Sequence, residues 1–373
     1  MVKPLLRNKR KGISGRKGLD FVKYAEALRD IPIKNRTTIR SLAAALDLPK
    51  STLHLNLKRL GLRASKTYLK PMLTEEGKVK RLEWALRWVR TTPPELGGGH
   101  KFQDFLNFVH LDEKWFYICK HGQKYYLHDD EDVPTRKVQH KSHITKVMFL
   151  AVVARPRYDP HRQSTFSGKM GIFPFTELRQ AVRNSARRAA GTWETKCVEV
   201  TKERYKEKLI QDVIPAIKRD WPRARRGETI WAQHDNAPSQ NLNDDPDIVR
   251  GCTADAWDIK FISQPSNSPD LNILDLGFFN SIQSLQDSTT PRTIDDLIAE
   301  VRTAFAAQTS EKLGAVWTTI QSILQEIMLA KGDNNFKLPH LKKAAAAGRG
   351  VSIPMELPCS QEAWEAAQSA LPS

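Results

Sequence analysis

The sequence predicts an α/β domain, a mixed sheet flanked by helices, behind a small all-α domain at the N-terminus. From about residue 105, apolar stretches first follow one another and then alternate with helical stretches, which is the order expected of such a sheet. Residues 1–70 hold 18 Lys and Arg against 4 Asp and Glu, whereas the other 303 residues hold 41 against 38. A basic end joined to a near-neutral body predicts a module that binds a polyanion.

The elements of the α/β domain can be predicted in order. Strands are expected where short stretches are rich in aromatic and β-branched residues, and helices where apolar residues recur every three or four positions. The predicted strands are 105–120, 123–128, 145–156, 169–175, 228–236 and 257–264. The predicted helices are 201–221, 246–256, 267–279 and two more beyond residue 292.

The N-terminal domain is predicted over residues 20–75, after a basic arm at 1–19. Residues 20–32 have helical spacing up to Pro32, and two short helices are predicted at 38–46 and 50–60 with "DLP" as the turn between them. This is a helix-turn-helix pattern, in which the second helix enters the major groove of DNA. An ordinary helical hairpin is the alternative. The predicted DNA contacts are Lys50, Ser51, Thr52, His54, Asn56, Lys58 and Arg59 on the second helix, with Arg16 and Lys17 in the arm.

Two further boundaries follow from composition. Residues 76–104 are predicted as a linker, because a charged helix is followed by "TTPPELGGGH" with its two prolines and three glycines. The α/β domain is then expected at 105–290, and residues 291–373 form a C-terminal helical region and tail.

The remaining composition excludes several classes of protein. The four cysteines are scattered without a C-x-x-C pair, which argues against a zinc ribbon and a disulfide framework and fits a reducing compartment. The longest apolar run, 147–154, is too short to span a bilayer. A soluble intracellular protein is therefore expected, and "RNKRKGISGRKG" (7–18) is a candidate nuclear import signal or minor-groove arm.

Three acids stand where a purely structural role is hard to assign. Asp112 lies within the predicted strand "FVHLDEKWF", Asp235 ends the predicted strand in "IWAQHDNAPSQ", and Asp275 follows in "SPDLNILDLGFF". A cluster of carboxylates inside a domain must raise its pKa values or hold cations. Oxygen-only sites suit Mg²⁺ or Mn²⁺, and two such ions about 4 Å apart can clamp both oxygens of a phosphoryl displacement. Together with a DNA-binding module, the acids predict cleavage of DNA strands.

The stretch 267–279 contains a second acid, Asp270, and the two need separate roles. If the stretch is a helix, a serine and a proline begin it, and Asp270 lies in its first turn, where a carboxylate suits the helix dipole. Asp275 is then roughly 140° around the helix from Asp270. It borders the apolar stripe of Leu271, Leu274 and Phe278, which is expected to pack on the sheet. Asp275 is therefore assigned as the third metal ligand and Asp270 as the helix start.

The three motifs carry a family resemblance. "HLDEKWF", "HDNAPSQ" and "SPDLNILDLGFF", in this order and behind a helix-turn-helix, resemble the mariner-like DDE/D transposases. The 39 residues between the second acid and the third resemble the plant-type mariner group, as do "KVMFLAVVARPRYD" and "GKMGIFPF". The resemblance covers about residues 35–290.

The resemblance implies an RNase H-like catalytic domain in which Asp112, Asp235 and Asp275 bind two Mg²⁺ ions, with Mn²⁺ as a substitute. It implies a cut-and-paste DNA transposase that binds terminal inverted repeats, hydrolyses a strand and joins the freed 3′-hydroxyl to target DNA at TA. Such enzymes work as homodimers in the nucleus, with no membrane and no nucleotide cofactor. The basic segment 177–196, between the first two acids, is either a DNA contact or a solvated helix face.

Two departures from the family pattern keep other functions open. Gln240 stands where the family commonly has His, and the chain has room for one helical DNA-binding subdomain where the family usually has two. The alternatives are a transposon-derived DNA-binding protein without transposition activity and a structure-specific nuclease of the same fold. Near the acids, Asn236 is interpreted as a turn residue, and His234 is given no metal role because it faces away from Asp235.

Overall fold

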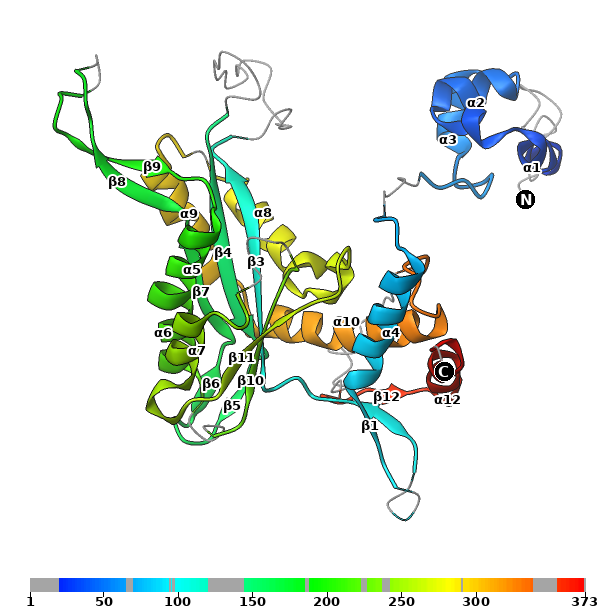
Figure 1. Cartoon of the computed structure of the whole chain (residues 1–373). Helices are drawn as coiled ribbons and strands as arrows, with labels where there is room; N and C mark the ends of the chain where they lie inside the picture. The colour runs from blue at the N-terminus through cyan, green and yellow to red at the C-terminus, as the bar shows by residue number, and fades with distance from the viewer. Residues whose placement is uncertain are drawn as a thin grey trace, which may run out of the picture. The chain divides into compact units, whose positions relative to one another are not determined.

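The chain divides into two compact units, Met1–Lys70 and Pro71–Ser373, each with its own hydrophobic core (Figure 1). The computed structural model describes residues 20–64, 70–93, 95, 98–119, 144–184, 188–222, 227–236, 242–289, 291–337 and 354–371. Arg16, Lys17, Gln240 and the predicted strand 123–128 lie outside the described residues.

The smaller unit is helical. It consists of α1 (Phe21–Asp30), a 3₁₀ turn η1 (Ile33–Arg36), α2 (Ile39–Ala45) and α3 (Lys50–Asn56). Its core side chains are Leu28, Leu42, Ala43, Leu46, Leu53 and Leu60. The hydroxyl of Thr38 accepts a hydrogen bond from the backbone of Ser41 and so fixes the start of α2. The two predicted helices and the turn between them are therefore present, with α3 ending four residues before the predicted end.

The larger unit is built on a five-stranded mixed sheet in the order β11-β10-β3-β4-β7. The long strand β3 (Phe108–Tyr117) runs antiparallel to β4 (Lys146–Ala154), which runs antiparallel to β7 (Lys169–Pro174). On the other side, β10 (Ile230–His234) runs parallel to β3, and β11 (Ile259–Ser263) runs parallel to β10. The predicted mixed sheet is confirmed.

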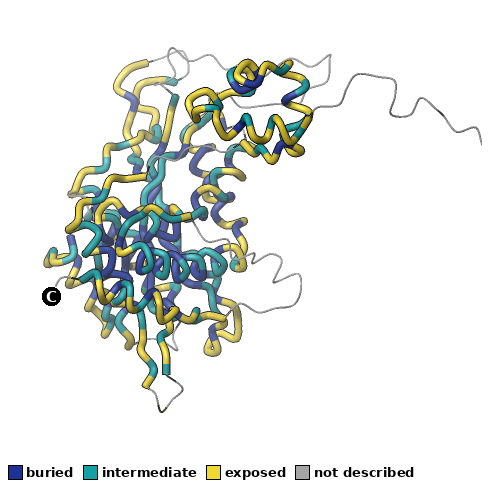
Figure 2. Tube along the Cα trace, turned by 90° about the vertical axis from the view of Figure 1, so that its right-hand side faces the viewer, coloured by how far each residue is buried: buried dark blue, intermediate teal, exposed yellow. Residues whose placement is uncertain are grey.

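Helices cover both faces of this sheet (Figure 1). One face packs against α5 (Lys202–Lys208), η4 (Leu209–Val213), α6 (Ile214–Asp220) and α7 (Pro246–Thr253). The other packs against α8 (Phe279–Gln286), α9 (Ile294–Ala306) and α10 (Ser310–Leu329). Residues of β3 alternate between the two cores, and Figure 2 shows the buried residues gathered in the middle of this unit.

Smaller elements complete the unit. A second sheet is formed by β1 (Val89–Thr91), β2 (His100–Phe102) and β12 (Pro358–Cys359), followed by α12 (Gln361–Ala370). Two hairpins are β5 (Arg157–Asp159) with β6 (Ser164–Phe166), and β8 (Thr176–Gln180) with β9 (Trp193–Cys197). In its described residues, the basic segment 177–196 is therefore a hairpin that projects from the sheet, and not a helix (Figure 1).

The segment predicted as a linker belongs to the core of the larger unit. Helix α4 (Glu75–Arg87) buries Leu82 and Ala85, and Trp88 follows it into the same cluster as α10 and α12. Most of the charged residues that suggested a linker are exposed, whereas Arg81 is fully buried. The observed boundary between the units is at Lys70, more than thirty residues before the predicted start of the α/β domain.

Candidate active site

Two neighbouring parallel strands bring Asp112 and Asp235 to the same place. In the register of β3 and β10, Gln233 lies opposite His110. Asp235 lies two residues after Gln233, just past the end of β10, and Asp112 lies two residues after His110 in β3. Because side chains alternate between the faces of a sheet, both acids lie on the face that α10 covers. The parallel pairing thus explains why acids 123 positions apart in the sequence meet.

The third acid comes from a segment that is not the continuous helix predicted from the sequence. A 3₁₀ turn η7 (Pro269–Leu271) is followed by extended backbone at Asn272 (φ −107°, ψ 123°) and one π-helical turn η8 (Leu274–Phe278). Gly277 adopts φ 130°, which favours glycine, and α8 begins only at Phe279. The predicted N-cap is also wrong, because the hydroxyl of Ser268 donates to the carbonyl of Ser266.

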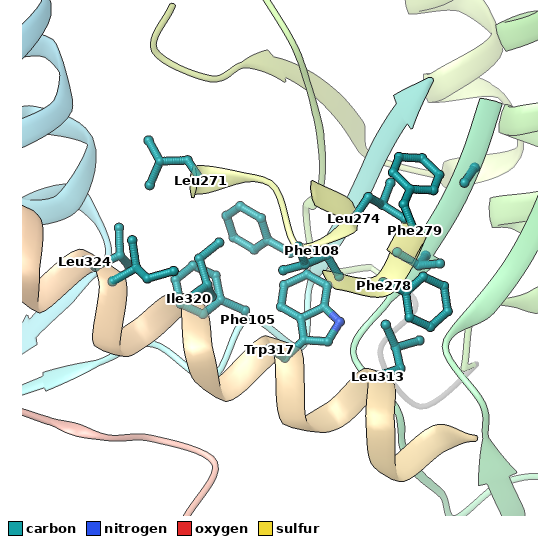
Figure 3. Close-up of a cluster of buried hydrophobic side chains, with 14 of the residues drawn as sticks. Phe105, Phe108, Leu271, Leu274, Phe278, Phe279, Leu313, Trp317, Ile320 and Leu324 are labelled. Carbon is teal, nitrogen blue, oxygen red and sulfur yellow. The ribbon is translucent and has the colours of Figure 1, made fainter. Parts of the chain in front are cut away.

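The apolar side chains of this segment still fix its place. Leu271, Leu274 and Phe278 are buried, and Figure 3 shows them lying over α10, on the side of Trp317 and Ile320. The predicted apolar stripe is therefore present, although irregular backbone forms it. It holds the backbone of Asp275 close to β3.

The two acids of the predicted helix have different partners. Asp270 receives two hydrogen bonds of 2.7 Å from the guanidinium of Arg81, whose side chain is 0% exposed. A third bond of 3.0 Å runs from Nε of Arg81 to the carbonyl of Gly332. Asp270 is therefore a structural ion-pair partner, and the assignment of Asp275 as the third metal ligand stays a prediction.

The carboxyl groups of Asp112 and Asp275 influence each other's ionisation. Burial raises the pKa of Asp112 well above its ordinary value, and the charge of Asp275 raises it further. Burial also raises the pKa of Asp275, against a hydrogen bond with Asp112 and the charge of Lys114. The charge of Asp235 raises the pKa of both. Burial and mutual repulsion thus favour protonation at this pair.

The carboxylate groups of these acids are suitable ligands for a hard divalent cation. Carboxylate oxygens are the ligands that Mg²⁺ and Mn²⁺ prefer, and a bound cation would offset the repulsion that raises the pKa of Asp112. In the described part of the chain, no three His, Cys, Asp or Glu side chains converge closely enough to hold an ion as they stand. Residues 237–241, directly after Asp235 and Asn236, are outside that part.

Two basic residues of β3 were not predicted as part of the site. Lys114 lies on the same face as Asp112, and its ammonium stands 5.5 Å from the ring centre of Phe279. His110 is fully buried, and burial lowers its pKa to about 3. Its neutral ring therefore accepts a hydrogen bond at Nδ1 from the backbone of Ile273 at 3.4 Å. The period-two alternation around Asp112 is the sequence signal that would have found both.

The other polar residues near the acids have structural partners. His234 is buried and its Nε2 is 2.8 Å from Oδ1 of Asn243, so it faces away from Asp235 as predicted. The side chain of Asn236 donates to the hydroxyl of Ser266 at 3.0 Å, which fits its interpretation as a turn residue. Asp258 receives a hydrogen bond from the hydroxyl of Thr229.

The predicted DNA contacts lie on α3 and directly after it. The exposed members are Lys50, Ser51, His54, Lys58 and Arg59. Thr52 and Asn56 are half-buried, and the amide of Asn56 donates to the carbonyl of Thr52 at 2.8 Å. The guanidinium of Arg59 lies 5.8 Å from the ring centre of Phe21. The basic side chains are thus available to a phosphate backbone, whereas Asn56 already has a partner. No helix in the described residues is long and apolar enough to cross a membrane.

The raised pKa of Asp112 makes a prediction about stability. Below its ordinary value of 3.8 the group is protonated in both the folded and the unfolded chain. Between that value and the raised folded-state pKa only the folded chain holds the proton, so this contribution to stability is lost as the pH rises. In EDTA at pH 7 we expect Asp112→Asn to melt at a higher temperature than the wild type, with the difference shrinking towards pH 4. Equal melting temperatures at pH 7 would contradict the buried acid pair.

The architecture and the acids together define an RNase H-like α/β fold, the class predicted from the sequence. Solved structures of the Mos1 mariner transposase share this fold at 16% sequence identity: a pre-cleavage Mos1 transpososome, the mariner Mos1 paired-end complex with Mg, and the Mos1 strand transfer complex. Each alignment covers 87% of this chain and 82% of the Mos1 chain, with TM-scores of 0.54, 0.54 and 0.52 respectively. No protein-family model and no curated protein matches the sequence.

Proposed function

We propose that the protein is a mariner-like cut-and-paste DNA transposase of the DDD type. The observation that carries the proposal is the parallel pairing of β3 and β10, whose register brings Asp112 and Asp235 to neighbouring positions, with the charges of Asp275 and Asp235 both raising the pKa of buried Asp112. The fold shared with Mos1 transposase structures supports it, as does the basic helical unit that precedes the sheet.

The chain's own residues would act in defined ways. The exposed basic side chains of α3 bind the phosphates of a terminal inverted repeat and hold the duplex. Asp112, Asp235 and Asp275 would hold two Mg²⁺ or Mn²⁺ ions. When bound, such ions supply an activated water and stabilise the leaving oxygen of the scissile phosphate. Lys114, on the same face of β3, opposes the rise in the pKa of Asp275 that burial causes, and so favours the ionised form that a metal would need.

The finer parts of the proposal come from the sequence motifs. The freed 3′-hydroxyl is joined to target DNA at TA, two copies of the chain pair the two transposon ends, and the reaction takes place in the nucleus. The spacing of Asp235 and Asp275 is that of the plant-type mariner group. Gln240 in place of His leaves a non-catalytic DNA-binding protein as the competing function.

The deciding experiment uses the DNA that flanks the coding sequence. A duplex carrying its terminal inverted repeat is incubated with full-length protein and Mg²⁺, together with a TA-containing target. Strand cleavage followed by a joined product supports the transposase. Nicks without joining favour a structure-specific nuclease, and binding without cleavage favours a DNA-binding protein that has lost its activity.

Binding of the DNA end is expected to weaken steeply with salt. Each phosphate contact contributes about −0.9 to the slope of log K against log salt concentration. We expect Lys58→Ala, on the exposed side of the unit after α3, to reduce the slope by about 1. The matched control is Lys23→Ala, an equally exposed lysine on α1, which should leave the slope unchanged. The binding constants are measured by fluorescence anisotropy at several salt concentrations. A flat salt dependence of the wild type would contradict phosphate binding by this unit.

A further inference from the structure

One fully buried amide connects the two segments that carry Asp112 and Asp275. The side chain of Asn272 is 0% exposed. Its Nδ2 donates a hydrogen bond of 3.0 Å to the carbonyl oxygen of Leu111. Its Oδ1 accepts a hydrogen bond of 3.1 Å from the backbone N–H of Leu274.

The two partners of this amide are the immediate neighbours of the two acids. The carbonyl of Leu111 belongs to the peptide group that leads into Asp112, and Leu274 directly precedes Asp275. Because the amide is planar and fully buried, it sets the distance and the direction between these two points of the backbone. The side chains of Asp112 and Asp275 take no part in this connection.

The same amide explains why the predicted helix breaks. A continuous helix through Asn272 would place its side chain on a helix surface, with no route to the carbonyl of β3. In the structure Asn272 has extended backbone, and its side chain forms a local turn with Leu274 of the kind that Asn favours. The chain then restarts as η8 with Asp275 in its first turn.

We infer that Asn272 is a positioning residue that fixes the segment carrying Asp275 against the strand carrying Asp112, as a divalent cation held by these acids would require. This inference rests on the proposed function, since it concerns the ion that the two acids would bind. Replacing a residue that orients a metal ligand through a hydrogen bond typically lowers metal affinity or activity by about 10- to 100-fold.

Two variants separate the bond to β3 from the local turn. Asn272→Ser keeps a hydroxyl that can accept from the N–H of Leu274, as serine does in turns, but it cannot reach Leu111. Asn272→Ala loses both bonds. Gln233→Ala is the matched control, because Gln233 is 2% exposed and its Nε2 donates to the carbonyl of Leu271 at 2.8 Å in the same segment.

The test measures Mn²⁺ binding to the full-length protein without DNA, by electron paramagnetic resonance of the free ion, and the melting temperature of each variant in EDTA. We expect Asn272→Ser and Asn272→Ala to weaken Mn²⁺ binding by about 10- to 100-fold. Gln233→Ala should lower the melting temperature but keep the wild-type affinity. The serine variant keeps the test valid if the alanine variant does not fold.

The outcomes are distinct. Wild-type affinity in Asn272→Ser overturns the positioning role, and so does an equal loss of affinity in Gln233→Ala, which would show that any loosening of the segment is enough. If the wild type and Asp275→Ala bind Mn²⁺ equally and the wild type does not cleave DNA, the proposed function itself fails.

Discussion

Replacing Asp275 by alanine is expected to abolish DNA cleavage while leaving binding of the DNA end intact. A catalytic metal contributes several kcal/mol of transition-state stabilisation, and about 1.4 kcal/mol corresponds to a tenfold change in rate. A loss of about 10³-fold or more is therefore expected, and the same holds for Asp112→Ala and Asp235→Ala. The measurement is single-turnover cleavage in Mg²⁺ alongside an equilibrium binding assay on the same duplex.

The binding assay is the internal control for this result, because helix α3, which is proposed to contact DNA, lies in the other unit, which has its own core. Removing a carboxylate from the acid cluster also relieves repulsion between buried charges, so Asp275→Ala should not lower the melting temperature in EDTA. Full cleavage by Asp275→Ala, with Asp270→Ala inactive although folded, would overturn the assignment of the third acid.

Replacing Asp270 is expected to have its large effect on stability instead. Asp270→Ala leaves the guanidinium of Arg81 buried without its charge partner, which typically costs about 3–5 kcal/mol. The free energy of unfolding is measured by urea denaturation. The double variant Arg81→Met with Asp270→Leu should recover most of the loss, because apolar residues of similar volume often replace a buried ion pair at little cost.

A surface ion pair of the same region provides the comparison. Lys78 and Asp333 are 3.3 Å apart, and the Asp333 side chain is 40% exposed. Asp333→Ala should cost no more than about 1 kcal/mol. The Asp270→Ala variant should still cleave DNA under conditions in which it is folded. If Asp270→Ala has the same unfolding free energy as the wild type, Asp270 is not the partner that Arg81 requires.

The sequence was sufficient for the mixed sheet, and it singled out the three acids that the proposed function uses. Strands such as β3 are long, apolar and β-branched, so their type could be predicted, and an acid inside such a strand is unusual enough to be noticed. Asp235 directly follows β10, whereas Asp112 lies within β3, and only the register of the two parallel strands shows that they reach the same level.

The remainder depended on contacts between distant parts of the chain. Arg81 and Asp270 are 189 residues apart, so neither could be recognised as a partner of the other from local pattern. The break at Asn272 follows from a bond to β3 that lies outside the segment, and helical periodicity alone could not show it. Helix α4 was interpreted as a linker because its charged face dominates its composition, although its apolar face is buried.

The packing of α4 against α10 and α12 has a consequence for synthesis on the ribosome. The core of the larger unit includes Leu82, near its beginning, and Ala363 and Ala367, close to its end. Nascent chains fold from the N-terminus as segments emerge, and contacts between distant segments form late. The basic helical unit can therefore reach its folded state early in translation. The larger unit must wait until α12 has been made, so a message cut short before α12 yields a chain that can fold the basic helical unit but cannot complete the core of the larger one.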